Sequence, residues 1–490
     1  MTDDTRRLIK EIPDRTTCAS PDDEKYKEER ERYANKESRP GVNEEAVMHL
    51  SEAITMRTVS NPDYSLTDFG PYVDFLNFLE RTYPNVHRIC HCEIINTYSP
   101  VYHWESDLKE GKPILFTGHY DVVPAEENAV GEWEAGPFSG TVLDGCVFGR
   151  GALDDKNQVI SIMEALEEAI GKGMMPKRDI YIAFGFDEEV GGEKGAKAIA
   201  SLFKERNLAF EFVLDEGGAV IEGVLEGLGV PAAMIGVTEK GSSNVTLRTK
   251  GDGGHSSMPT KDSAIGTLSK VIGNIEDHPL PARLTLPVKE MFRSMAPFMG
   301  KRGFLLRHMG LTFPFLKRTL SRSVTLNSLI RTTISFTMAG SGEAKNILPR
   351  EAWANASIRI LPGDTLDGVM EHMRNVNKGI PFEMEKVDIE EASMVSPIDS
   401  ASYLMLEKNI GLEFPGVVVM PYLMAGSTDS RKYSDLCRNI YRFSAISMTG
   451  RDLDSIHSTN EKISKENLMH MVSFYARLLS EFSSLSVKAN

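Results

Sequence analysis

The sequence predicts an α/β protein in which helices flank a mixed, largely parallel sheet and a small α+β domain is inserted into the larger one. Short apolar runs alternate with amphipathic helical segments in the first half of the chain. The pattern changes near Gly236 to alternating strands with two helices, and changes back near Asp388. The 490 residues, 41% hydrophobic and 26% charged, can bury a sizeable core, and they exclude a disordered or collagen-like chain.

In the first half, three apolar runs predict buried parallel strands, because each is short and ends at turn or polar residues. These strands are expected at 113–117, 179–186 and 211–214. Apolar residues at helical spacing predict helices from about residue 42, at 157–170 and at 196–203. Strands that alternate with helices in this way are typical of βαβ units.

The second part of the chain has a different character. Alternating residues at 244–248, 324–338 and 352–360 predict half-buried antiparallel strands, and helices are expected at 262–277 and 365–376. A final helix at about 465–485 returns the chain to the larger domain. The expected division is therefore 1–236 with 388–490, and 237–387 as the insert. Residues 1–45 are highly charged and are interpreted as a solvated arm.

Charge and targeting signals narrow the function. A net charge of -15 disfavours nucleic-acid binding. The five cysteines suit free thiols in a reducing compartment, and residues 1–17 lack the apolar core of a secretory signal, so a cytoplasmic location is expected. The apolar stretch Met295–Phe315 is interrupted by Lys301, Arg302 and Arg307, so no membrane span is expected. We interpret this stretch as packing within the insert, with a surface for an acyl tail as the alternative.

Polar clusters follow the predicted strands and turns. Their sequences are GHYDVVP (118–124), GRGALDDK (149–156), FDEEVGG (186–192) and LDEGG (214–218). In open α/β sheets, sites gather beyond the carboxyl ends of the strands. Carboxylates crowded there repel one another unless a dication supplies the opposing charge. Histidine and carboxylate ligands suit zinc, manganese or cobalt, and a pair of metals needs one carboxylate to bridge them.

Together with IHSTNE (456–461), these motifs resemble those of the co-catalytic zinc exopeptidases, a family that includes aminoacylase, acetylornithine deacetylase, succinyl-diaminopimelate desuccinylase, dipeptidases and carboxypeptidases. Within it, the chain most resembles the Gly-X carboxypeptidase and N-acyl-amino-acid amidase branch, over most of residues 45–485. The resemblance implies that residues 1–236 and 388–490 form the catalytic domain and that 237–387 form a ferredoxin-like lid, which can also join two chains in a homodimer. It further implies two Zn²⁺ per chain, with Co²⁺ or Mn²⁺ as substitutes.

The resemblance also assigns roles to individual residues. The implied metal ligands are His119, Asp154 as the bridge, Glu189, Asp215 and His457. Asp121 would orient the imidazole of His119 from behind, and Glu188 would be the general base. A cis peptide bond is expected between Asp154 and Asp155.

Other residues are assigned to the substrate. His255, in GGHSSMP, resembles the family histidine that donates to the developing oxyanion, which in dimeric relatives comes from the partner subunit. The expected partners of a substrate carboxylate are Arg359, Asn346 and the loop of Gly426, Ser427 and Thr428.

The resulting functional prediction is a dizinc hydrolase that cleaves the amide bond of short peptides or N-acyl amino acids that bear a free carboxylate. Three hypotheses stay open: a carboxypeptidase or dipeptidase, an N-acyl-amino-acid amidase that accepts long acyl chains, and a non-catalytic, metal-stabilised binding protein. Two motifs are set aside. The spacing of Cys90, His91 and Cys92 is too tight for a structural zinc site, and Gly149-Arg150-Gly151 lacks the third glycine of a dinucleotide motif.

Overall fold

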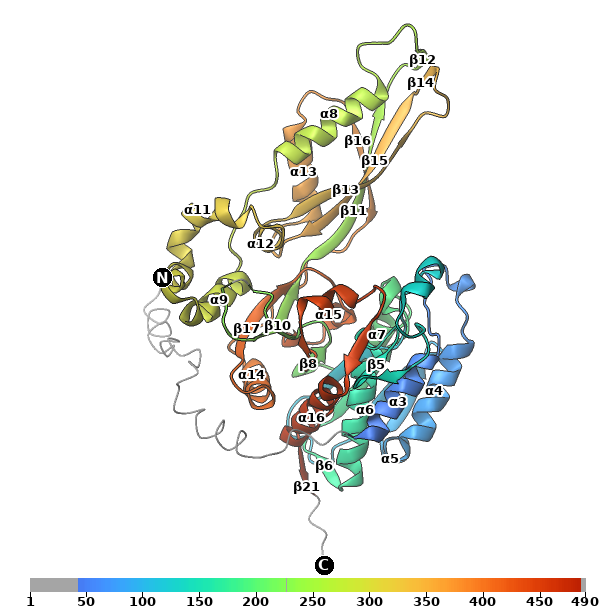
Figure 1. Cartoon of the computed structure of the whole chain (residues 1–490), viewed down its shortest axis with the longest axis vertical. Coiled ribbons are helices and arrows are strands. Elements are labelled where there is room, and N and C mark those ends of the chain that lie inside the picture. The colour runs from blue at the N-terminus through green and yellow to red at the C-terminus, as the bar shows by residue number, and fades with distance from the viewer. Residues whose placement is uncertain (1–42, 226, 486–490) are drawn as a thin grey trace, which may run out of the picture.

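A ten-stranded mixed sheet forms the centre of the larger domain in the computed structural model, which describes residues 43–225 and 227–485 (Figure 1). Most of the predicted 1–45 arm therefore lies outside the described residues. The strands are β1 (His91–Ile95), β2 (Ser99–Trp104), β3 (Ile114–His119), β7 (Ile180–Gly185), β8 (Phe212–Asp215), β9 (Val220–Ile221), β10 (Ala232–Glu239), β17 (Val418–Met424), β18 (Ile440–Arg442) and β19 (Ser447–Met448).

The middle of this sheet is parallel, as the sequence predicts. β3 pairs in parallel with β7 on one side and with β8 on the other, and β8 pairs in parallel with β18. Every residue of β3, β7 and β8 is buried, which explains why these strands are continuous apolar runs. Because the three strands are neighbours and point the same way, their carboxyl ends meet at one edge of the sheet.

Helices cover the sheet. α6 is nearly all buried and contacts α3, α5 and α16, while α7 packs against β7 and the 3₁₀ turn η6 (Asp429–Tyr433). The helices of this domain are α3 (Glu44–Thr55), α4 (Gly70–Thr82), α5 (Pro84–Ile89), α6 (Lys156–Gly171), α7 (Ala196–Glu205), α14 (Ala401–Glu413), α15 (Gly450–Ser455) and α16 (Lys465–Glu481).

The lid consists of two layers, a sheet and a pair of helices, and extends away from the larger domain (Figure 1). Its strands β11 (Gly241–Lys250), β13 (Thr333–Ser341), β15 (Glu351–Ile360) and β16 (Glu383–Asp388) are antiparallel in the order β13-β15-β11-β16. Alternate residues of β11 and β15 are buried, and they pack with α8 (Ala264–Asp277) and α13 (Leu366–Val376). The short strands β12 (Gly254–His255) and β14 (Ile347–Leu348) pair at its far tip (Figure 1).

One predicted strand is wrong in part. Residues 324–338 were expected to be a single strand, but Val324–Ile330 form helix α12, and β13 begins only at Thr333. The side chain of Ser323 accepts a hydrogen bond from the Leu326 backbone N–H and caps this helix. α12 belongs to a helical segment that also contains α9 (Leu286–Met295), α10 (Gly303–Arg307) and α11 (Met309–Leu320). α9 packs on β17 of the larger domain.

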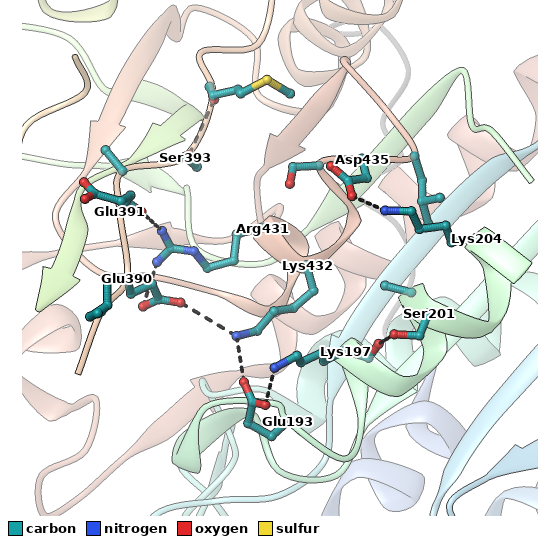
Figure 2. Close-up of a pocket in the computed structure, with 16 residues that line it drawn as sticks. Glu193, Lys197, Ser201, Lys204, Glu390, Glu391, Ser393, Arg431, Lys432 and Asp435 are labelled. Carbon is teal, nitrogen blue, oxygen red and sulfur yellow. Dashed lines mark hydrogen bonds and ion pairs between the residues drawn. The ribbon is translucent and has the colours of Figure 1, made fainter. Parts of the chain in front are cut away.

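Two stretches of chain cross side by side between the domains. The Ser242 N–H donates to the Glu390 carbonyl at 2.8 Å, and the Ser393 N–H donates to the Glu239 carbonyl at 3.1 Å. Figure 2 shows the hollow beside this crossing, where side chains of η6 reach the second stretch: Arg431 lies 2.9 Å from the Glu390 carboxylate. We call these two stretches, 239–242 and 390–393, the hinge.

A small sheet ties the C-terminal region to the middle of the chain. β20 (Lys462–Ser464) pairs with β5 (Cys146–Phe148), which pairs with β4 (Val142–Leu143). A further pair joins β21 (Ser483–Leu485) to β6 (Met174–Pro176). Among the residues described, no helix has the length and apolar character needed to cross a membrane.

The close approach of β8, β10 and β18 yields a prediction at Gly218. A Cβ there would lie 2.2 Å from the Met234 carbonyl oxygen and 2.5 Å from that of Arg442. We expect Gly218→Ala to lower the free energy of unfolding by about 3 kcal/mol, because the neighbouring backbone must move to make room for the methyl group. The unfolding temperature should fall with it.

Gly411 in α14 is the matched control, because a Cβ there meets nothing within 4 Å. Gly411→Ala should raise the unfolding temperature, since alanine favours a helix interior by about 0.5–1 kcal/mol over glycine. Equal unfolding temperatures for the Gly218 variant and the parent, measured by scanning fluorimetry, would contradict the packing described here.

Candidate metal centre

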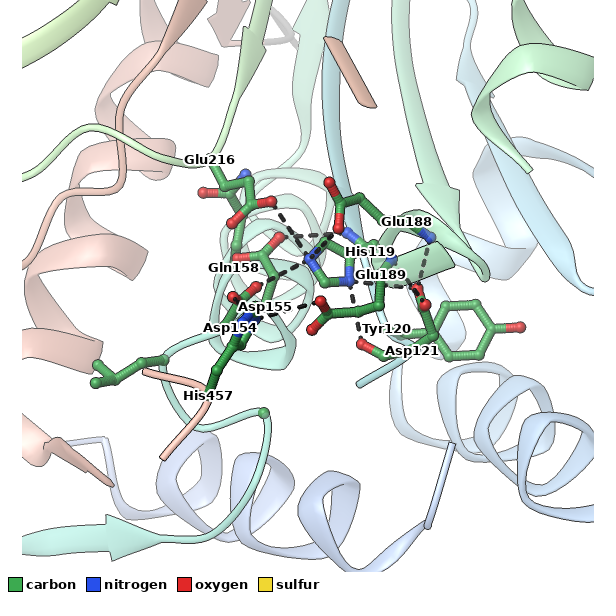
Figure 3. A network of polar contacts seen from close by, with 12 residues as sticks. His119, Tyr120, Asp121, Asp154, Asp155, Gln158, Glu188, Glu189, Glu216 and His457 are labelled. Carbon is green, nitrogen blue, oxygen red and sulfur yellow. Dashed lines mark hydrogen bonds and ion pairs between the residues drawn. The ribbon is translucent and has the colours of Figure 1, made fainter. Parts of the chain in front are cut away.

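His119 is the last residue of β3, and its buried imidazole faces two carboxylates (Figure 3). Its Nε2 lies 3.0 Å from Asp154 Oδ1 and 3.3 Å from Glu216 Oε1. The donor atoms of these three residues all lie within 4.8 Å of one another and could hold a metal ion. The other ring nitrogen, Nδ1, lies 3.1 Å from the Asp121 backbone carbonyl oxygen and 3.3 Å from its carboxylate Oδ1, so Asp121 sits behind the ring.

A second group shares Asp154. His457 Nε2 lies 2.9 Å from Asp154 Oδ2 and 3.2 Å from Glu189 Oε2 (Figure 3). Asp154, Glu189 and His457 again place their donor atoms within 4.8 Å of one another. Each oxygen of the Asp154 carboxylate thus faces a different histidine, which is the arrangement that a bridging ligand requires.

The loop that carries Asp154 is held from the C-terminal region. Glu461 is fully buried, and its Oε1 accepts hydrogen bonds from the backbone N–H groups of Gly151 and Leu153 at 3.0 and 2.8 Å. Its Oε2 accepts from Arg150 Nη1 at 2.5 Å. The Asp154–Asp155 peptide bond is cis, as expected. Glu461 is absent from the residues predicted from the sequence, although its position four residues after His457 is a usable signal.

Glu216, not Asp215, joins His119 and Asp154. Asp215 is the ligand that the resemblance implies, but its Oδ2 accepts a hydrogen bond from the Ser430 backbone N–H at 2.8 Å, and it belongs to neither group of donor atoms. Successive residues at a strand end point to opposite sides, so only one of the two carboxylates can face His119. The sequence LDEGG does not say which one.

Electrostatics at this edge of the sheet favour bound cations. Burial, followed by repulsion from Asp154, raises the pKa of Glu216 to about 8. Hydrogen bonds to Asp154 and Glu189 raise the pKa of His457 to about 10. Buried oxygens of Glu189 and Asp215 have no hydrogen-bond partner. A site with excess carboxylates, protonated histidines and unpartnered oxygens fits divalent cations bound by nitrogen and oxygen ligands.

Glu188 belongs to neither group, and its carboxylate faces His119 of the first one (Figure 3). Its Oε2 is 3.9 Å from His119 Nε2. The Asp121 carboxylate accepts from the Glu188 and Glu189 backbone N–H groups at 3.1 and 3.2 Å, which fixes the turn η3 (Glu188–Val190) at the end of β7. Burial raises the pKa of Glu188 well above its ordinary value, and Glu216 adds to that shift.

The predicted substrate residues are not all brought to this edge. His255 and Asn346 lie together at the far tip of the lid, where the Ser256 N–H donates to the Asn346 carbonyl at 3.1 Å. His255 is exposed there, with its Nδ1 2.8 Å from Ser257 Oγ. Figure 1 shows this tip, marked by β12 and β14, at the end of the lid that is remote from β8.

Arg359 and the Gly426–Thr428 loop lie closer to this edge of the sheet than the lid tip does. Arg359 is near the C-terminal end of β15, at the base of the lid, beside the hinge residue Lys240, whose pKa is lowered to about 8 by burial and then by Arg359. Thr428 donates from both its N–H and its hydroxyl to Glu239 Oε1, at 2.8 and 2.9 Å. Gly426 and Ser427, the other two residues of that loop, are exposed and half-buried, respectively.

Asp429 is an additional buried carboxylate that follows this loop. Its oxygens lie 2.4 Å and 2.1 Å from the positions that a Cβ on Gly185 or Gly192 would occupy, so a larger residue at either position would force the Asp429 side chain to move. Burial, with repulsion from Asp215, raises its pKa well above the ordinary range.

Comparison with known proteins agrees with this geometry. Residues 115–481 match the sequence pattern of peptidase family M20/M25/M40. The chain is 36% identical over 445 residues to the probable carboxypeptidase S-like 2 of Dictyostelium discoideum, which spans 89% of this chain and 84% of that protein. It is 34% identical over 440 residues to the N-fatty-acyl-amino acid synthase/hydrolase PM20D1 of Xenopus tropicalis, with 88% and 84% covered.

Solved structures share the fold. The M20 family metallo-carboxypeptidase Sso-CP2 from Sulfolobus solfataricus superposes with a TM-score of 0.65 at 18% identity, over 89% of this chain and 98% of that one. Human carnosine dipeptidase 1 gives 0.59 at 17% identity, over 93% and 98%. At such identities the likeness concerns the fold, whereas the family match and the closer sequence relatives cover most of the chain. The chain therefore belongs to peptidase family M20/M25/M40.

Proposed function

We propose that this chain, an M20 hydrolase, uses two Zn²⁺ ions to cleave an amide bond beside a free carboxylate. The observation that carries the proposal is the pair of donor groups that share Asp154, with the Glu188 carboxylate, a member of neither group, beside His119. In this proposal His119, Asp154 and Glu216 hold one ion, and Asp154, Glu189 and His457 hold the other. Co²⁺ and Mn²⁺ are expected to substitute, since the ligands are nitrogen and oxygen.

The chain's own groups then have distinct tasks. A pair of dications supplies polarisation of a carbonyl and acidification of water. Glu188 accepts the proton of the attacking water and later delivers it to the leaving amine. Its raised pKa is the direction that such a proton carrier needs near neutral pH. Asp121 keeps Glu188 in place through the backbone of η3 and keeps His119 in one orientation.

For the substrate, the likenesses support two classes. Carboxypeptidase S-like relatives favour short peptides, the primary prediction, and relatives named N-fatty-acyl-amino acid synthase/hydrolases favour N-acyl amino acids, the second. Both classes carry a free carboxylate, for which Arg359 and the Gly426–Thr428 loop are the proposed partners. Because His255 and Asn346 lie at the lid tip, we infer that they serve a site only after the lid rotates or in the partner of a homodimer. The cytoplasmic location stays a prediction.

Glu188→Gln tests the proton carrier. We expect kcat to fall by about 10²–10⁴-fold, because general acid–base help is lost, while the bound metal is unchanged. Metal content by mass spectrometry and hydrolysis rates are measured on the same samples. Glu189→Gln is the matched comparison and should lose metal as well as activity. A Glu188→Gln enzyme with full activity would sink the mechanism, and full hydrolysis by the parent protein excludes a binding-only role.

Glu216→Ala against Asp215→Asn tests the ligand assignment. We expect Glu216→Ala to weaken one metal site by at least about tenfold, since a donor is removed, and Asp215→Asn to keep the parent stoichiometry. Metal titration with a chromogenic chelator gives both affinities. Loss of a site in Asp215→Asn alone would restore the assignment made from the sequence.

A substrate panel separates the two classes. Dipeptides, N-fatty-acyl amino acids and the methyl esters of both are compared by kcat/KM. We expect each ester to be at least about 10²-fold slower than its acid, because the charge-assisted contacts to the carboxylate are lost. Activity on fatty-acyl amino acids without activity on dipeptides would refute the peptidase assignment, and equal rates for esters and acids would refute the role of the carboxylate.

A further inference from the structure

The helical segment 286–330 carries apolar side chains on its outer surface. In α11, Met309 and Leu320 are buried against the protein, whereas Leu311 is 79% and Phe315 83% exposed on the opposite side. In α10, Phe304 is 69% exposed. All 22 phenylalanines of the chain lie in the described part, and only Phe304 and Phe315 are exposed. A helix that is apolar on both faces is normally covered on both.

The same segment is strongly basic in an acidic protein. It holds eight Lys or Arg and a single Glu, while the whole chain has a net charge of -15. Six of these cations are exposed, and among the described residues none of the six forms an ion pair: Lys301, Arg302, Arg307, Lys317, Arg318 and Arg322. Within α11, Leu311, Phe315 and Arg318 follow at spacings of four and three residues, so apolar and basic side chains share one stripe.

We propose that the outer surface of α10 and α11 docks on an anionic lipid surface, with Phe304, Leu311 and Phe315 inserted among the lipids. Exposed aromatic and leucine side chains beside lysine and arginine are what an interfacial helix presents to acidic headgroups. A second copy of the chain is disfavoured, because a two-fold contact would bring the same cations face to face. The proposal concerns binding and does not depend on the reaction assigned to the metal centre.

The place of the segment in the fold suits this role. α9 packs on β17, and the Lys240 ammonium donates to the carbonyls of Ser328 and Arg331, both at 3.0 Å, so the segment is fastened to the larger domain and to the hinge. Figure 1 shows α9 and α11 at the margin of the molecule, beside the junction of the two domains. A lipid surface can therefore approach α11 without contact with the lid tip.

Flotation with vesicles tests the proposal on the full chain. The parent protein should bind vesicles that contain about one third phosphatidylserine, and bind phosphatidylcholine vesicles at least about tenfold less, with loss of binding as salt rises. Leu311→Ser with Phe315→Ser should reduce binding at least about tenfold. Lys317→Glu with Arg318→Glu should do the same, since each cation near an acidic surface strengthens binding about fivefold.

Matched controls change the same chemistry elsewhere. Met48→Ser with Leu108→Ser alters two exposed apolar side chains of the larger domain, and Lys261→Glu with Lys378→Glu reverses two exposed lid cations. Both should bind vesicles like the parent, and unfolding temperatures verify that every variant is folded. Failure of the parent to float, unchanged binding in both test variants, or a dimer that Leu311→Ser with Phe315→Ser dissociates in the absence of vesicle binding would overturn the proposal.

Discussion

Crowded negative charge at one edge of the sheet is the constraint on which the rest of the structure depends. The carboxyl ends of β7, β3 and β8 lie side by side, and each delivers acidic side chains into a space that the protein largely buries. Burial raises the pKa values of Glu188, Glu216 and Asp429, so the crowded carboxylates are electrostatically unfavourable without a positive counter-charge. In the proposed site, cations at the two groups around Asp154 would offset that repulsion, and the surrounding hydrogen bonds hold the carboxylates close together.

Those hydrogen bonds come from groups that do not touch the proposed ions. Asp121 holds His119 and the turn η3, while Glu461 holds the loop of Asp154. Glu239 is fully buried, accepts from Arg442 Nε at 3.1 Å and anchors Thr428. The loop so anchored then offers the Ser430 N–H to Asp215. The site is thus supported by a shell of buried charged groups, each paired, which agrees with the rule that such groups are expensive unless they are satisfied.

Sequence reasoning predicted most of this arrangement and missed parts of it for physical reasons. The strands that carry the motifs were predictable because buried parallel strands are continuous apolar runs, and α6 because its periodicity is helical. The choice between Asp215 and Glu216 was not predictable, because it depends on which side of the end of β8 faces His119. The strand predicted at 324–338 was wrong in its first half, because Ser323 caps a helix within an apolar stretch whose pattern also suits a strand. The position of His255 depends on how the lid is oriented, which local sequence does not encode.

The pairing of β20 with β5 has a consequence for how the protein comes into being. Arg150 and Glu461 are separated by 311 residues of sequence. The whole lid likewise lies between Asp154 and His457 in the chain. Asp154 and Glu216 therefore precede the lid in the chain, whereas Glu461, which holds the loop of Asp154, follows it. In the proposed site, the second donor group is complete only in a chain that extends past His457, so a protein truncated before that residue would keep Asp154 and Glu189 without the histidine that they share.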